Sequence, residues 1–162
     1  MTPTKNSWRE PQLIGKAFEN YALEFLFPRE DFDFLERVPE YTSNKKHFAL
    51  NALNPDFKFK DKTTGRVFFV EVKFRGRCKK SNEIRWTYPA QLLRYLSFNR
   101  SCPTYVLIGV GGSPECPELI GLIPIEQACY TRLWLKTIMR FTIPAATAVR
   151  SEMLQRTYPT IS

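Results

Sequence analysis

The dipeptide Pro55-Asp56 and the tripeptide Glu71-Val72-Lys73 stand fourteen residues apart, with a turn-forming segment between them. This spacing suits a β-hairpin whose two strands bring Asp56 back beside Glu71. Side chains of a strand alternate between its faces, so Glu71 and Lys73 share one face and Val72 points to the other. Two carboxylates and a lysine then meet in one place, a combination that suits metal-dependent cleavage of a phosphodiester bond.

A divalent cation is the natural partner of such a pair. Two close carboxylates raise each other's pKa unless a cation lies between them. Ligation by oxygen atoms alone favours a hard ion, so we expect Mg²⁺ or Mn²⁺ on Asp56, Glu71 and the backbone carbonyl of Val72. Lys73 is placed to orient an attacking water and to offset developing negative charge. This chemistry requires neither histidine nor cysteine.

The elements that must position these residues are a helix and a hairpin. Ser7-Trp8-Arg9-Glu10 has the pattern of a capping box, and Pro28 ends the predicted helix at about Phe27. An apolar stripe at helical spacing is expected to face the core: Leu13, Ile14, Ala17, Phe18, Tyr21, Ala22 and Phe25. The hairpin follows from alternation around Phe57 and Phe59, a polar turn over 61–65 and an apolar strand over 67–74.

The remaining segments complete an α/β pattern. We expect strands at about 33–38, 48–53, 104–110 and 119–125, helices at about 89–98 and 126–139, and a loosely ordered or short helical tail after Ile143. The prediction is a central mixed β-sheet flanked by α-helices. At 162 residues the chain suits one domain, with the motif-bearing core at about 7–128 and a C-terminal helix and tail at 129–162.

With these motifs in order, the chain resembles the PD-(D/E)xK nuclease superfamily, whose restriction-endonuclease-like fold includes many restriction enzymes and Holliday-junction resolvases. The segment Gly15 to Glu19 is similar to the family's first helix, and Gln91-Leu92-Leu93-Arg94-Tyr95 is similar to its Q-x-x-x-Y motif. The resemblance implies that Glu19 is an accessory metal ligand. It also implies that Gln91 contacts the metal shell or the substrate backbone, and that Tyr95, one turn later, contacts the nucleic acid.

Several candidates have plain structural alternatives. Glu24 is the alternative to Glu19 on the first helix, and either is also compatible with a solvated surface carboxylate. A basic loop follows the catalytic strand and is expected to contact phosphates without reading bases: Arg75, Arg77, Lys79 and Lys80. Trp86 and Tyr88 suit either base stacking or core packing. His47 is expected to be structural or incidental.

The net charge and the histidine and cysteine content favour some classes of partner and metal site and argue against others. The net charge of +8 favours a polyanionic partner such as nucleic acid. The single histidine argues against His-based nucleases and zinc hydrolases. The four cysteines show no C-x-x-C spacing, so neither a zinc site nor a disulfide framework is expected. No membrane span or signal peptide is evident, and we expect a cytoplasmic protein.

The leading hypothesis is a metal-dependent nuclease acting on DNA, with RNA left open and with a homodimer or a larger DNA-processing complex compatible with its size. The second hypothesis is a noncatalytic nucleic-acid-binding module or scaffold subunit with the same fold. A third treats the motifs as coincidence on an unrelated basic α/β domain, and it expects Asp56, Glu71 and Lys73 not to converge. Endo- against exonuclease action, sequence- against structure-specific cleavage and the number of metal ions stay open.

Overall fold

The computed structural model describes residues 10–37, 54–78, 80–144 and 147–155. The predicted strand at 48–53 and His47 lie outside these residues. The described elements, in chain order, are α1 (Pro11–Tyr21), the π-helix η1 (Ala22–Leu26), β1 (Phe32–Arg37), β2 (Phe57–Asp61), β3 (Val67–Arg75), β4 (Glu83–Arg85), α3 (Pro89–Asn99), β5 (Thr104–Ser113), β6 (Cys116–Pro124), the 3₁₀-helix η2 (Ile125–Ala128), β7 (Arg132–Trp134), α4 (Leu135–Arg140) and α5 (Ser151–Gln155).

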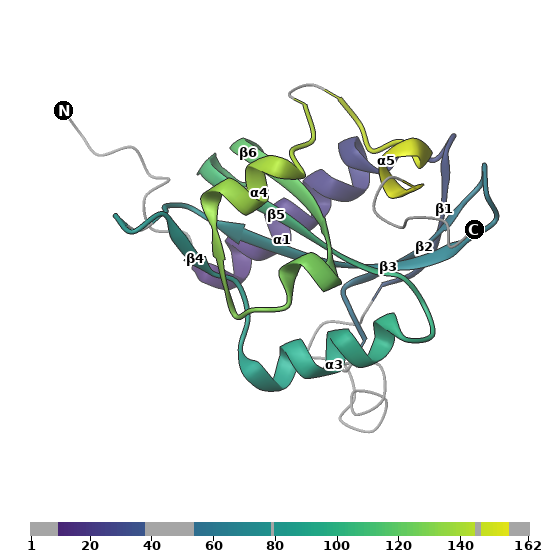
Figure 1. The fold of residues 1–162 in the computed structure, drawn as a ribbon. Helices are drawn as coiled ribbons and strands as arrows, with labels where there is room; N and C mark the ends of the chain where they lie inside the picture. The colour runs from purple at the N-terminus through teal and green to yellow at the C-terminus, as the bar shows by residue number, and fades with distance from the viewer. Residues whose placement is uncertain (1–9, 38–53, 79, 145–146, 156–162) are drawn as a thin grey trace.

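Five strands form the central sheet, in the order β1-β2-β3-β5-β6. Only the β3–β5 pair is parallel, and α3 makes the crossover between these two strands. The other three pairs are antiparallel, so the sheet is mixed. Helices α1 and α3 lie on opposite sides of this sheet (Figure 1). The predicted fold class is therefore confirmed.

The alternation of side chains along β5 separates two apolar cores. Tyr105 and Leu107 pack with Phe18 of α1, whereas Val106 and Ile108 pack on the face that α3 covers. Because β5 is the central partner of β3 and β6, it is buried on both faces and carries a nearly continuous apolar run. None of the described helices is long and apolar enough to span a membrane.

The first helical segment ends at Leu26, close to its predicted end, but differs from its prediction at its start and in the form of its last turn. It begins at Pro11 rather than after Ser7, because the residue before a proline is driven out of the helical region and Glu10 is extended with ψ 143°. Near its end the hydrogen bonding widens to a π-turn, with the Phe27 N–H donating to the Ala22 carbonyl (3.1 Å). The extra residue turns Leu26 and Phe27 into the core and leaves Phe25 56% exposed.

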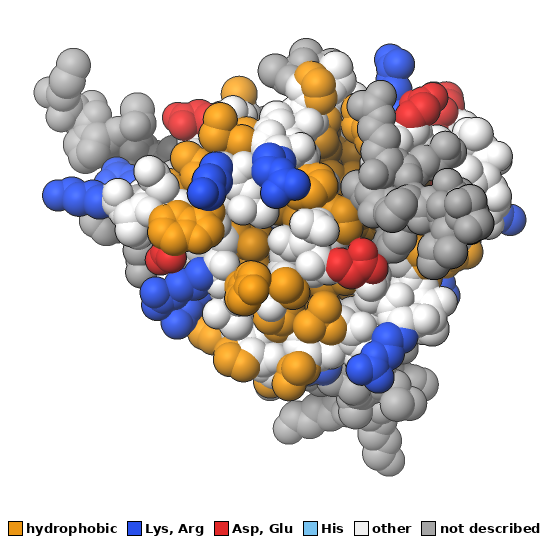
Figure 2. All heavy atoms as spheres, in the orientation of Figure 1, with side chains coloured by type: hydrophobic (Ala, Val, Ile, Leu, Met, Phe, Trp, Pro, Cys, Tyr) orange, Lys and Arg blue, Asp and Glu red, His pale blue; other side chains and the backbone are white. Residues whose placement is uncertain are grey.

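The predicted helix over 126–139 is wrong. The chain instead forms η2, then strand β7, then the short helix α4. β7 pairs antiparallel with β4 in a separate two-stranded ribbon, and the Trp86 indole N–H donates to the Tyr130 carbonyl (2.7 Å). These tertiary contacts outweigh the local helix propensity on which the prediction rested. Over β4 and α4 the surface carries hydrophobic and basic side chains side by side (Figure 2).

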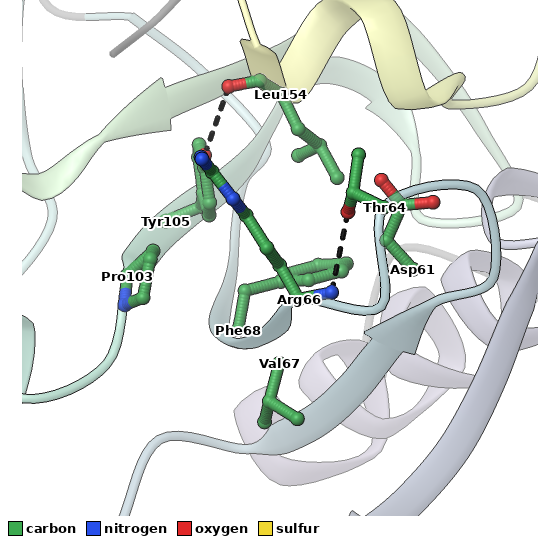
Figure 3. A pocket seen from close by; sticks show the side chains of 8 residues that line it. All are labelled: Asp61, Thr64, Arg66, Val67, Phe68, Pro103, Tyr105 and Leu154. Carbon is green, nitrogen blue, oxygen red and sulfur yellow. Dashed lines mark hydrogen bonds between the residues drawn. The ribbon is translucent and has the colours of Figure 1, made fainter. Parts of the chain in front are cut away.

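The segment 151–154 packs beside the turn of the β2–β3 hairpin. The Ser151 hydroxyl donates to the buried Asp61 carboxylate (2.5 Å), and the Tyr105 hydroxyl donates to the Leu154 carbonyl (3.2 Å; Figure 3). The small pocket beside these contacts measures about 20 Å³, which is room for little more than one water molecule. The predicted short helical tail is present as α5.

Candidate active site

Strands β2 and β3 place Asp56 directly beside Glu71. Phe57 pairs with Val70, so the next step along the antiparallel ladder sets Asp56 opposite Glu71. The Asp56 N–H approaches Glu71 Oε2 at 3.3 Å, and the Val72 N–H donates to Asp56 Oδ2 at 2.9 Å. The five-residue connection that closes the hairpin is secured at its far end, where the Asp61 N–H donates to the Arg66 carbonyl (2.8 Å).

Lys73 completes the group from the same face of β3. Its ammonium lies 2.7 Å from Glu71 Oε1, and the Glu71 side chain is only 5% exposed. The hydroxyl of Tyr95, on α3, lies close enough to the Glu71 carboxylate for the two groups to interact. Glu71 therefore has neighbours from the residue before β2, from β3 and from α3. The three residues of the hairpin motif converge, which the coincidence hypothesis did not expect.

Burial and repulsion set the electrostatics of the group. Burial raises the pKa of Asp56 well above its ordinary value, and the charges of Glu71 and Glu19 raise it further, although the Val72 N–H and Lys73 oppose this. For Lys73, burial lowers the pKa, but the Glu71 ion pair outweighs that cost and the net shift is upward. The site thus holds the buried Glu71 and the half-buried Asp56 against one ammonium, an arrangement that favours a further cation.

The donor set fits a hard divalent cation. The carboxylate oxygens of Asp56 and Glu71 are ligands that Mg²⁺ and Mn²⁺ prefer, and these ions retain several waters of their own. Among the described residues, no group of three or more His, Cys, Asp and Glu side chains is close enough to hold a metal. Ligation would therefore depend on two carboxylates, backbone oxygen and water. The role of the Val72 carbonyl stays a prediction.

An open groove of about 920 Å³ runs past this group. Its walls are the N-terminal half of α1 and the C-terminal end of β3. Asp56, Lys73 and Arg75 line it from one side, and Lys16 and Glu19 line it from the other. The groove brings the predicted first-helix segment and the hairpin motif to one solvent-accessible place.

Glu19 lies on the groove wall and is bound to a residue that the sequence patterns did not single out. Its Oε2 accepts a hydrogen bond from Arg37 Nη2 at 2.9 Å. Arg37 is the last residue of β1, and no local spacing relates it to α1, so only the fold reveals the pair. The alternative residue, Glu24, is exposed and lines a different pocket beside Pro28.

Helix α3 carries two of the predicted site residues, Tyr95 and Gln91, and only Tyr95 approaches the Glu71 carboxylate. Tyr95 is 3% exposed and stacks on Trp86, with its hydroxyl near Glu71. The expected contact of Tyr95 with nucleic acid is therefore wrong, because its ring is enclosed in the core. Burial, first of all, and the charge and hydrogen bond of Glu71 raise the pKa of Tyr95. Gln91, one turn earlier, is half-buried and accepts a hydrogen bond from the Thr87 hydroxyl (3.1 Å).

The basic loop after β3 is divided in its roles. Arg75 is half-buried, and its guanidinium donates to the carbonyls of Phe74, Arg85 and Trp86. Burial lowers the pKa of Arg75, an effect that the nearby Tyr88 opposes. Arg77 and Lys80 are exposed, and Lys79 lies outside the described residues. Of the two candidate stacking residues, Trp86 is fully buried and Tyr88 is 63% exposed.

Comparison with known proteins bears on the fold. Neither a protein-family model nor a curated protein sequence matches the chain. Among solved structures, Hjc, a Holliday junction resolvase from the archaeal hyperthermophile Archaeoglobus fulgidus, is similar, with a TM-score of 0.55. The match covers 88% of this chain and 99% of that one, at 12% sequence identity. The chain has a resolvase fold. Within this fold, the groove and the Asp56, Glu71 and Lys73 cluster lie at the end of the β2–β3 hairpin opposite its turn.

Proposed function

We propose that the protein is a metal-dependent nuclease that hydrolyses phosphodiester bonds in DNA. The observation that carries the proposal is the convergence of Asp56, Glu71 and Lys73 at the wall of an open groove. The net charge of +8 and the resolvase fold support a nucleic-acid substrate. DNA is preferred because the solved neighbour is a Holliday junction resolvase.

In this proposal each residue has a defined task. Asp56 and Glu71 would hold Mg²⁺ or Mn²⁺, with the Val72 carbonyl as an accessory ligand. Glu19, which is paired with Arg37, would assist the ion from the groove wall through one of the ion's own waters. The ion, when bound, supplies charge stabilisation and a water of lowered pKa. Lys73, held at 2.7 Å from Glu71, orients the attacking water and offsets negative charge at the scissile phosphate. Tyr95 and Gln91 act from α3: Tyr95 fixes the Glu71 carboxylate, and Gln91 contacts the substrate backbone.

The test is cleavage of a panel of substrates in Mg²⁺, Mn²⁺ or EDTA. The panel holds single-stranded, linear duplex, circular and four-way-junction DNA together with RNA. We expect metal-dependent cutting that falls by about 100-fold or more in Lys73→Ala, the order of effect seen when one charge-stabilising donor is removed. Lys60→Ala is the matched control, because Lys60 is exposed on β2 near the turn of the same hairpin. It should cut at the wild-type rate.

The alternative is a noncatalytic nucleic-acid-binding module. It is favoured if no substrate is cut in either metal while DNA binds equally well in EDTA and in Mg²⁺. Isothermal titration with Mg²⁺ adds a readout independent of turnover. The proposed site predicts that Asp56→Ala abolishes the binding heat, whereas a pure binding module shows none in the wild type.

A further inference from the structure

The β4–β7 ribbon presents one face to solvent that the proposed active site does not use. Ile84 and Leu133 are each 3% exposed and point into the core. Because strand side chains alternate, the other positions face outward. These outward residues are Glu83, Arg85, Arg132 and Trp134. The ribbon is thus an amphipathic two-stranded sheet with a polar and aromatic outer face.

Repulsion between like charges on this outer face reduces the stability of the folded protein. Arg85 and Arg132 are direct cross-strand partners, and like charges in that position destabilise a ribbon. Glu83 offsets the charge of Arg132 weakly, since its Oε2 lies 3.9 Å from Arg132 Nη1 and both side chains are partly exposed to water. The ribbon keeps a net positive charge, and a bound polyanion would relieve the repulsion.

Two exposed aromatic rings accompany these arginines. Trp134 is 50% exposed at the end of the ribbon, and Tyr88 is 63% exposed just beyond β4. The Arg85 guanidinium lies over the Tyr88 ring at 5.7 Å from its centroid. Exposed aromatic faces interleaved with arginine are the features with which proteins hold single-stranded nucleic acid, because unpaired bases stack on the rings while cations meet the phosphates. Paired bases in a duplex offer no free face to such rings.

Arg75 joins this surface to the proposed site. It lines the groove together with Asp56 and Lys73, and its guanidinium donates to the carbonyls of Arg85 (2.8 Å) and Trp86 (3.2 Å). The ribbon therefore begins where the groove ends. Figure 2 shows the resulting mixture of hydrophobic and basic side chains where Figure 1 draws β4.

We propose that the outer face of the β4–β7 ribbon binds an unpaired nucleic-acid strand, which it receives from the groove. Arg85 and Arg132 contact the phosphates, and Trp134 and Tyr88 stack on bases. The placement of this strand beside a cleavage site rests on the proposed nuclease function, whereas the binding itself does not.

The experiment measures fluorescence anisotropy in EDTA, so that no strand is cut. The probes are labelled single-stranded DNA, single-stranded RNA of the same sequence and the corresponding DNA duplex. Trp134→Ala should weaken single-strand binding by roughly 5- to 150-fold, which corresponds to the loss of one stacked base. Trp134→Phe should restore most of it. The double variant Arg85→Gln/Arg132→Gln should reduce the slope of log affinity against log salt by about 1.4.

A charge-matched control is Arg29→Gln/Arg150→Gln, which removes two exposed arginines away from the ribbon and the groove. The slope of log affinity against log salt for this control should differ from the wild-type slope by less than about half of the change expected for Arg85→Gln/Arg132→Gln. Melting temperatures of all variants establish that each is folded. Loss of affinity for either single strand, DNA or RNA, supports the proposal, and the two probes show which sugar is accepted.

Wild-type affinity in both ribbon variants overturns the proposal. It is also overturned if the duplex binds as tightly as the single strand and Trp134→Ala changes neither affinity. Cleavage assays run in parallel separate this failure from that of the nuclease. Ribbon variants that lose binding in a protein that never cuts leave the ribbon proposal standing alone. Metal-dependent cutting with ribbon variants that bind normally leaves the nuclease standing alone.

Discussion

At the scale of single residues, the site is a carboxylate pair, the buried Glu71 and the half-buried Asp56, with only one ammonium beside it. Glu71 is engaged by Lys73, by Tyr95 and by the Asp56 backbone. Asp56 has one oxygen on the Val72 N–H, and its pKa is raised by burial and by neighbouring negative charge. A side chain in this position binds a proton or a metal cation in competition with each other.

This competition predicts a pH dependence of stability. In EDTA, the raised pKa of Asp56 means that its contribution to stability is fully present below the ordinary value of 3.8 and is lost as the pH rises through the folded-state value. We expect the melting temperature of the wild type to fall relative to that of Asp56→Asn as the pH rises. Added Mg²⁺ should reverse the trend, because metal binding releases the proton.

Thermal unfolding at a series of pH values, with and without Mg²⁺, checks this expectation. Asp33→Asn is the control, since the Asp33 side chain is 51% exposed and only loosely paired with Lys62. Parallel pH curves for the wild type and Asp56→Asn would contradict the argument.

The motif residues were predictable from sequence because they are local to one hairpin. Asp56, Glu71 and Lys73 were placed together by strand alternation and turn composition alone. The partners of those residues were less accessible. Arg37 reaches Glu19 from the last position of β1, and that contact depends on how α1 crosses the sheet.

At the scale of elements, the close approach of α1 to the sheet positions Glu19. Phe18, its neighbour, is fully buried against β5 at Gly109. A Cβ at Gly109 would lie 2.8 Å from Phe18 Cζ and 3.1 Å from Phe74 Cδ2. The absence of a side chain at this position therefore sets the distance between helix and strand, and with it the width of the groove.

Gly109→Ala tests this role. We expect it to reduce the free energy of unfolding by about 1–3 kcal/mol, the usual cost of overpacking a core, and to slow cleavage because α1 moves away. Gly15→Ala is the matched comparison, because a Cβ there meets nothing within 4 Å. In the helix interior it should instead stabilise by about 0.5–1 kcal/mol. Urea unfolding measures both, and equal shifts of the same sign would refute the argument.

Element prediction succeeded where the pattern was long and failed where tertiary contacts decided. The strands β3 and β5 were evident from their apolar runs. The prediction of a helix over 126–139 was wrong because the Trp86 indole bonds to the Tyr130 carbonyl and β4 pairs with the chain there as strand β7. The π-turn in η1, which exposes Phe25, has no signature in a stripe counted at 3.6 residues per turn.

At the scale of the whole molecule, the C-terminal segment stabilises the site-bearing hairpin from its far end. Ser151 bonds to Asp61, which is 2% exposed at the end of β2. Ser151→Ala should cost about 1.5–3 kcal/mol, the range for a hydrogen bond to a charged group. Its cleavage rate, measured well below the melting temperature, should stay at the wild-type value because Asp56 lies at the other end of the hairpin.

Thr147→Ala is the matched control for this prediction. Thr147 is exposed, and its hydroxyl donates locally to the Pro144 carbonyl. It should change the free energy of unfolding by less than about 0.5 kcal/mol. Chemical denaturation followed by circular dichroism compares the two, and a Ser151→Ala protein as stable as Thr147→Ala would contradict the proposed contact.

The contacts made by the C-terminal segment also fix an order of events during protein synthesis. The Val149 N–H donates to the Leu26 carbonyl, Ser151 to Asp61 and Tyr105 to the Leu154 carbonyl. While the ribosome is still covering residues 149–154, none of these bonds exists, although the sheet has already been translated. A nascent chain therefore holds Asp61 in contact with water instead of Ser151. These bonds therefore form after the strands that they secure have left the ribosome.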